Sequence, residues 1–470
     1  MGGGHLDLST DQLNLDHLVK KAWGIGATLI VFGLIATIML GALSGGDDGH
    51  GGDAASGAAE SHGDHHEDHH KGDHSAGHSA DESKAGEKDH DSHGHHAYHG
   101  YVSHPEAPAQ WYHRLLVNAT FFLSITIGAL FFIIIHHLVR AGWSTSLRRL
   151  AEGVSLNFIV LAVIFIPITM TEGLQNLFVW WDTSPDGQAA QDPLVAVKAS
   201  YLNPEMFRLR VIAYFALWIG MALFFYGNSV KQDSSGDPKI SRRMGKMSPV
   251  ALLLFATSVT FASFDFLMAL DAHWFSTMFG VYFFAGCVLS WHAFLALLVI
   301  WLQHNGRLQK TVTVEHMQDV GKMVFAFTVF WAYVAFSQYM LYWYANIPEE
   351  TGWFLRRQEI FSWGAWGFFL VFGHFVVPFL FLLSKHVKRR KTTLAIGASW
   401  MLIVHWCDLY YIVMPQLFDG LVFPFHLLDV SLFLTLGGIY LCTTAWFLKR
   451  HSLVAVKDPR LPEALAFHNA

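Results

Sequence analysis

The sequence contains a series of apolar runs of roughly 20 residues or more, about the length of α-helix that crosses a hydrocarbon core of about 30 Å. A backbone surrounded by lipid must satisfy its own hydrogen bonds, so each run predicts one helix. We expect an all-α integral membrane protein with about ten transmembrane helices. The expected spans are 22–43, 113–139, 152–174, 206–229, 248–270, 275–302, 320–345, 358–383, 393–414 and 427–448.

Composition narrows the function classes. Apolar residues make up 53% of the chain and charged residues 14%, against roughly a quarter in soluble proteins, so lipid is the expected solvent. The 31 basic residues lie in short clusters between the apolar runs, which argues against binding of nucleic acid. Cys287, Cys407 and Cys442 are far apart, so the spacing for an iron–sulfur cluster or covalent haem is absent.

The basic residues also predict orientation, because Lys and Arg near helix ends are retained in the cytoplasm. Most of them fall on one side if the N-terminus is inside, for example Arg140 to Arg149, Lys231 to Lys246 and Lys385 to Lys391. We expect both termini to be cytoplasmic, in a multi-pass protein of the bacterial inner membrane. Lys20 and Lys21 precede the first run, which we interpret as an uncleaved anchor.

The segment from Ser44 to His104 is rich in Gly, Ala, Ser, Asp and His and almost free of large apolar residues. Such a composition cannot bury a core, so we expect a disordered external loop. Its histidine clusters suit opportunistic binding of zinc, copper or nickel, but no fixed ligand spacing is visible.

Ionisable residues within the apolar runs are candidates for function, because they are costly in a bilayer. Asp265 lies among aromatic residues and should face the bundle interior, where burial favours its neutral form and proton exchange with the external side. The alternative is a carboxyl that only braces a neighbouring helix. His137 and Glu152 are further candidates, although Glu152, like Glu172 and Lys322, is near a helix end and can reach interfacial water.

His405 and Asp408 are three residues apart, so they share a helix face on which the carboxylate can orient the imidazole. We expect them to form a relay pair within a hydrogen-bonded proton path. The other expected members of this path lie on neighbouring helices: His292, Tyr333, Gln338 and His374. Ordinary buried polar braces explain any one of these residues equally well.

Two rival sites remain open at this point. Histidines on facing helices hold haem in some membrane bundles, but His136 and His137 are adjacent and point apart, which disfavours paired ligands. A quinone ring can dock near aromatic residues at the outer surface, here Trp111, Tyr112, Trp180 and Trp181. Interfacial Trp and Tyr more often form an anchoring belt.

Two sequence blocks carry a family resemblance: SFDFLMALDAHWFSTMFGVYFFAG from Ser263, and FAFTVFWAYVAFSQYMLYWYANIPEETGW from Phe325 to Trp353. Over about residues 110–450 the chain resembles the ActF type of second large membrane subunit of bacterial alternative complex III, in the NrfD/PsrC-like class. The resemblance implies two four-helix bundles, 113–270 and 275–414. The first helix, in 1–43, and the last, in 427–470, would be peripheral. The external loop expected from composition, in 44–112, lies outside the resemblance.

The resemblance further implies a subunit of a quinol:cytochrome c oxidoreductase that binds no cofactor or metal itself. A homologous quinol-binding membrane subunit, multihaem cytochrome c and iron–sulfur subunits would be its partners, in some cases with a terminal oxidase, and haem c and the clusters would be on those partners. This chain would contribute a proton path, quinone-side structure or scaffold. An independent proton-coupled secondary transporter and an inert structural subunit are the alternatives.

Overall fold

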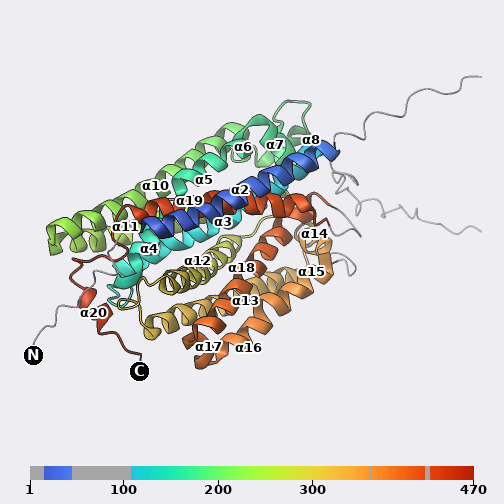
Figure 1. The fold of residues 1–470 in the computed structure, drawn as a ribbon. Helices are drawn as coiled ribbons and strands as arrows, with labels where there is room; N and C mark the ends of the chain where they lie inside the picture. Colours follow the sequence, from blue (N-terminus) through green and yellow to red (C-terminus); the bar gives the residue numbers. More distant parts are fainter. Residues whose placement is uncertain (1–14, 45–106, 359–362, 419–423, 470) are drawn as a thin grey trace, which may run out of the picture.

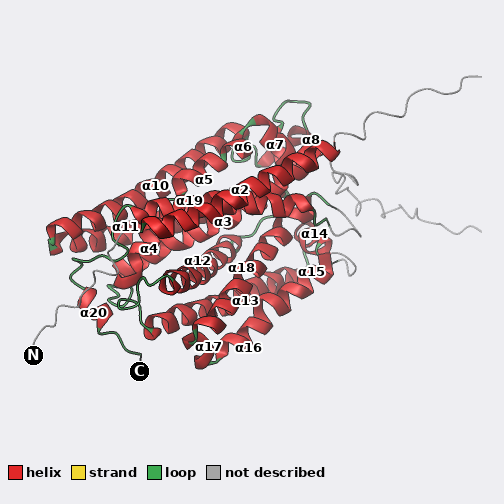
Figure 2. Ribbon diagram, in the orientation of Figure 1, coloured by secondary structure: helices red, strands yellow, loops and turns green. Residues whose placement is uncertain are grey.

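The computed structural model describes residues 15–44, 107–358, 363–418 and 424–469, and the regular structure in these ranges is entirely helical (Figures 1 and 2). The expected external loop, 44–112, lies outside them apart from Ser44 and residues 107–112, which are helical rather than disordered. The long helices are α2 (Asp16–Ser44), α3 (Ala107–Leu138), α10 (Pro204–Ser235), α11 (Pro238–Phe266), α12 (Phe279–His304), α13 (Val314–Ala345), α18 (Lys391–Val413) and α19 (Leu427–Lys449).

Shorter elements connect or interrupt these helices. Those of the first half are α4 (Thr145–Ser155), α5 (Phe158–Ile164), α6 (Ile166–Thr169), α7 (Thr171–Leu177), η1 (Val179–Trp181), α8 (Gln188–Gln191), α9 (Pro193–Val197) and η2 (Met268–Leu270). Those of the second half are α14 (Pro348–Arg356), α15 (Trp363–Leu370), η3 (Val371–Val376), α16 (Val377–Leu383), α17 (Lys385–Arg389), η4 (Met414–Gln416) and α20 (Leu461–Leu465).

Within the described ranges, 9 helical segments are long and apolar enough to cross a membrane. The prediction of an all-α, multi-pass membrane protein is therefore confirmed. The predicted span 152–174 is the exception, because it is broken into α4, α5, α6 and α7 rather than forming one helix. Pro167 at the start of α6 is one cause, since proline lacks the N–H that would continue the ladder.

The broken run nevertheless extends along the full length of α3. Arg148 in α4 lies 3.4 Å from His137 near the end of α3, whereas Glu172 in α7 accepts a hydrogen bond from Tyr112 near its start. His137 and Tyr112 are separated by about 38 Å of helix rise. The α4 to α7 run thus supplies a tenth crossing, and Figure 1 shows it lying beside α10.

Helix α3 is the centre of the molecule, and 89% of its most apolar window is buried. It packs against α4, α11, α12, α18 and α19. By contrast, the outer faces of the peripheral helices expose large apolar side chains such as Ile38, Leu253 and Phe368. An apolar exterior around a fully packed central helix is the pattern of a protein solvated by lipid.

Helix α2 lies antiparallel along α19, and glycines allow the two backbones to approach closely (Figure 1). A Cβ on Gly26 would lie 2.8 Å from the Gly438 carbonyl oxygen, and one on Gly33 would lie 2.6 Å from the Ser431 carbonyl oxygen. Small residues of this kind are what bring helices together in a membrane, where burial of apolar surface gives no drive. Lys449 pairs with Asp16, so the start of α2 and the end of α19 lie on the same side of the membrane.

Candidate functional site

A buried carboxylate, Asp408, is the centre of the candidate site. It lies in α18, and only 2% of its surface is exposed. The hydroxyl of Tyr282 in α12 donates a hydrogen bond to one oxygen, and the indole Nε1 of Trp331 in α13 donates to the other at 3.1 Å. Two donors from two helices therefore hold the carboxylate in one orientation.

His374 faces this carboxylate from an unusual helical turn. The segment η3 is a π-helix, in which the N–H of Val377 bonds to the carbonyl oxygen of Phe372 five residues earlier. Pro378 accounts for the wide turn, because a proline ring clashes with the carbonyl four residues before it, here that of His374. Single π-turns within α-helices are frequent at functional sites.

The His374 ring is completely buried and stacks on Trp331, with the ring centroids 3.7 Å apart. Neither of its nitrogens has a hydrogen-bond partner among the described residues. Buried imidazoles are usually hydrogen-bonded, so the two unbonded nitrogens mark His374 as a candidate for function. Trp331 thus positions both the Asp408 carboxylate and the His374 ring.

His405 completes the group from one turn before Asp408 on α18. Its Nε2 lies 2.9 Å from the Ser124 hydroxyl of α3, which is in turn 3.2 Å from the Ser290 hydroxyl of α12. A Cβ on Gly286 would lie only 2.7 Å from the His405 Cε1 atom, so a glycine is needed there for the ring to fit. Its Nδ1 has no hydrogen-bond partner in the described part of the chain.

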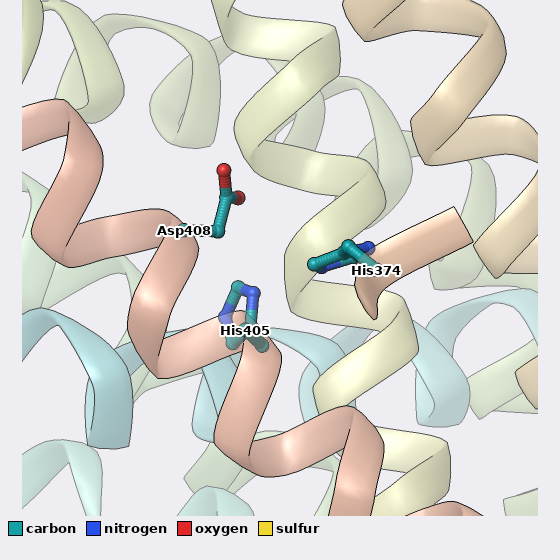
Figure 3. Close-up of side chains that lie close together, drawn as sticks. All are labelled: His374, His405 and Asp408. Atoms are coloured by element: carbon teal, nitrogen blue, oxygen red, sulfur yellow. The ribbon is translucent and has the colours of Figure 1, made fainter. Parts of the chain in front are cut away.

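Figure 3 shows how the three side chains meet, with His405 and Asp408 on one helix and His374 opposite them. One ligand-type atom from each lies within 4.8 Å of the others. The predicted pairing of His405 with Asp408 is correct in placing both on one face. The carboxylate, however, bonds to Tyr282 and Trp331 rather than directly to the imidazole, which bonds to Ser124.

The same three residues have the side-chain types of a transition-metal site. A tetrahedral zinc site with bonds of about 2.0–2.1 Å places its ligand atoms about 3.3 Å apart. Here the three atoms lie within 4.8 Å of one another, and the Asp408 oxygens already accept two hydrogen bonds. A carboxyl and two imidazoles are also the groups that most often exchange protons in proteins.

The other three residues predicted for the proton path, His292, Tyr333 and Gln338, differ in their burial and in their contacts. Gln338 is buried on α13, on the same face as Trp331. His292 is buried on α12, but its Nδ1 bonds to the Val288 carbonyl of its own helix at 2.7 Å. Tyr333 points away from the cluster with 64% of its surface exposed, so the structure does not bring it to the site.

Asp265 faces the interior, as expected, but it is not an isolated carboxyl among aromatic rings. Both of its oxygens accept hydrogen bonds from Arg210 of α10, at 2.9 and 2.8 Å, and Tyr214 donates a third at 2.6 Å. Arg210 lies in the predicted span 206–229, but nothing in the sequence pairs it with Asp265. The contacts are those of a structural brace between α10 and α11.

His137 and Glu152 belong to a separate buried group at the α4 end of α3. Arg149 forms an ion pair with Glu152 at 3.0 Å and another with Asp233 of α10 at 2.7 Å. Arg148 lies against His137 and pairs with Asp458 near the C-terminus. These contacts tie α4 to its neighbours and do not reach the cluster around Asp408.

The aromatic residues considered for quinone docking are only partly at a surface. Trp180 is completely buried and donates from Nε1 to the Ala269 carbonyl at 2.9 Å, so it is neither an anchoring-belt residue nor free to meet a ring. Trp111 and Tyr112 contact each other edge to face.

The site can therefore hold and pass protons among a carboxyl, two imidazoles and three hydroxyls drawn from α3, α12, α18 and η3. The sequence analysis did not assign Tyr282 or Gly286 to the site. Both lie within the first sequence block quoted above, which was the one indication of them in the sequence. No protein-family model and no curated protein matches this chain.

Proposed function

We propose that this chain is a cofactor-free membrane subunit of a quinol-oxidising respiratory complex in the bacterial inner membrane. Both termini would be cytoplasmic, and the His374, His405 and Asp408 cluster would lie on a proton path through the subunit. The resemblance of the two long sequence blocks to alternative complex III supports the assembly. The buried cluster, with its unbonded imidazole nitrogens, supports the path.

The roles of the residues follow from their contacts. Asp408 takes up or releases the proton, and Tyr282 and Trp331 stabilise its charged form by donating to it. His374 has nitrogens available to receive that proton across a gap that one water or a ring rotation bridges. His405 passes it toward Ser124 and Ser290 at the centre of the molecule.

The observation that carries the path is His374, a fully buried imidazole without a hydrogen-bond partner in the described residues, held at a π-turn within 4.8 Å of a carboxylate. His292 differs in that its Nδ1 bonds to the carbonyl of Val288 in its own helix, whereas neither nitrogen of His374 has a partner in the described residues. The partners proposed for the complex are the homologous quinol-binding subunit, multihaem cytochrome c and iron–sulfur proteins, with a terminal oxidase in some cases.

The test is Asp408→Asn in the complete complex, with Asp186→Asn in an exposed segment as the matched control. Complex abundance is measured first, by native gel and haem content. We expect normal assembly with proton release per quinol reduced at least several-fold in Asp408→Asn and unchanged in the control. Unchanged proton release in an assembled Asp408→Asn complex would contradict the path.

Membership of the complex is tested separately by native mass measurement of a membrane extract. We expect this chain to co-migrate with multihaem cytochrome c and iron–sulfur proteins. Finding it alone would favour an independent transporter. The structure offers little support for an independent transporter. Transporters built from internal repeats have broken helices at matching positions in the two halves. Here the broken helices are the second span of the first bundle, 152–174, and the third span of the second bundle, 358–383.

A further inference from the structure

A cavity of about 650 Å³ lies between α2 and α19 on one side and α3, α12 and α18 on the other. It follows α19 from Asp429 to Leu448, about 28 Å of helix rise, which is close to the thickness of a hydrocarbon core. Ile403 lines it and is also 57% exposed, so the cavity opens to the lipid-facing surface. We call this cavity the α19 groove.

Three of the polar groups that line the α19 groove, those of Asp429, Tyr440 and Trp406, already have partners within the protein. Asp429 forms a buried ion pair with Arg114 at 3.1 Å, and the Tyr440 hydroxyl lies 2.9 Å from that of Thr126. Trp406 donates to Asn118 at 2.9 Å. These groups are engaged within the protein, whereas a hydrocarbon chain needs only the apolar wall that makes up most of the groove.

The two ends of the groove differ in charge. At one end, the charges of Asp429 and Arg114 cancel each other in their ion pair. At the opposite end, exposed Lys21 directly precedes the lining residue Ala22, and exposed Lys449 directly follows the lining residue Leu448. Lys21 reaches Asn305, one turn beyond the lining residue Trp301, with its Nζ 3.5 Å from the amide oxygen. One acidic group, Asp16, faces Lys449 there.

We propose that the α19 groove binds an anionic phospholipid, with an acyl chain along α19 and the phosphate held by Lys21 and Lys449. Basic residues at the cytoplasmic ends of clefts between transmembrane helices bind anionic headgroups in this way. The proposal places the lipid beside the seam between α2 and α19, so its acyl chain fills space that the two helices leave open against α12. It does not depend on the proposed respiratory function.

The test uses the full-length chain in nanodiscs of phosphatidylcholine, with phosphatidylglycerol as the anionic probe and native mass spectrometry as the measurement. We expect one tightly held phosphatidylglycerol per chain. Lys21→Gln should weaken its retention about fivefold, and Lys21→Gln with Lys449→Gln about 30-fold, because each lysine near a headgroup contributes a factor of this size. Lys21→Arg should retain the lipid, and Lys246→Gln, at an exposed position on α11, should have no effect.

A second variant tests the acyl-chain part of the proposal. Ala445→Phe fills the groove near its basic end without removing a charge, so it should reduce retention of the same lipid while Lys21 and Lys449 remain. Equal retention of phosphatidylcholine, co-purification of one quinone per chain instead of phospholipid, or retention that ignores both lysines would each overturn the proposal.

Discussion

Replacing Arg210 by methionine removes the cation that pairs with the buried carboxylate of Asp265. The carboxylate is completely buried, and the neutral hydroxyl of Tyr214 also donates to it. Breaking a buried ion pair from one side costs about 3–5 kcal/mol, because the remaining charge is left uncompensated. Since 15% of the Arg210 side chain is exposed, we expect about 3 kcal/mol, the lower end of this range.

The opposite replacement should cost less. In Asp265→Asn the guanidinium keeps its hydrogen bond to the Tyr201 carbonyl at 2.9 Å and its stacking on the Tyr201 ring, and it retains partial access to solvent. We expect a loss of about 1.5–2 kcal/mol, the lower part of the range for a lost hydrogen bond to a charged group. The free energy of unfolding of the double variant should be close to that of Asp265→Asn alone. The coupling energy between Arg210 and Asp265 is then at least about 2 kcal/mol.

The measurement is unfolding of the purified chain in mixed micelles by titration with sodium dodecyl sulfate, as a double-mutant cycle. The exposed pair of Lys322 and Asp319 is the matched control and should give less than about 1 kcal/mol of coupling. Equal losses for the two single variants at the Arg210 pair, with coupling no larger than in the control, would refute the structural role assigned to Asp265.

Two further predictions concern other parts of the chain. Gly286→Ala should displace the His405 ring and lower proton release without removing any titratable group. Gly220→Ala is the control and should leave proton release unchanged, because an added Cβ there meets nothing within 4 Å. Equal proton release in both variants would contradict the site geometry. Burial by itself raises the pKa of Asp192, but the hydrogen bond and charge of His273, 2.5 Å away, and two backbone amides outweigh it, so the pKa lies below its ordinary value. A lowered pKa means that this contact stabilises the segment above about pH 4, and that the stabilisation is lost as the pH falls through the folded-state pKa. Hydrogen exchange of the backbone amides around residue 192 should therefore rise on acidification of the native chain. An equal rise in Asp192→Asn would contradict the assignment.

The sequence predicted the spans well because run length is a direct consequence of bilayer thickness. The span 152–174 was the least accurate, since the breaks within it depend on how α4 to α7 follow α3. The π-turn at His374 was also missed. Pro378 was visible in the sequence, but proline in a helix produces a kink, a break or a wide turn according to its neighbours.

The candidate site was predicted in part. His405 and Asp408 share a face because they are three residues apart, and helix geometry alone gives that result. The same geometry separates Tyr333 from Gln338, because five residues turn a helix by about 140°. Helix geometry alone therefore predicts that the two side chains do not belong to one path. Trp331 and Gln338, seven residues apart, do share a face.

Partners across helices could not be predicted in the same way. Arg210 and Asp265 are 55 residues apart, and Tyr282 and Asp408 are 126 apart. Each pairing depends on the rotation of two helices about their axes, and apolar runs that are buried on several sides leave that rotation undetermined. Only packing details such as the space that Gly286 leaves for His405 fix it.

The glycine seam between α2 and α19 joins the first described helix of the chain to the last long one. Trp23 and Cys442, which are in contact, are 419 residues apart. At about 5–20 residues per second, roughly 20–80 s of synthesis separate the two halves of this seam. Throughout that time Gly26 and Gly33 lack the α19 backbone against which they pack in the finished fold. Completion of the fold is therefore coupled to completion of the chain, and a ribosome that stops before α19 leaves α2 undocked and open to recognition by membrane quality control.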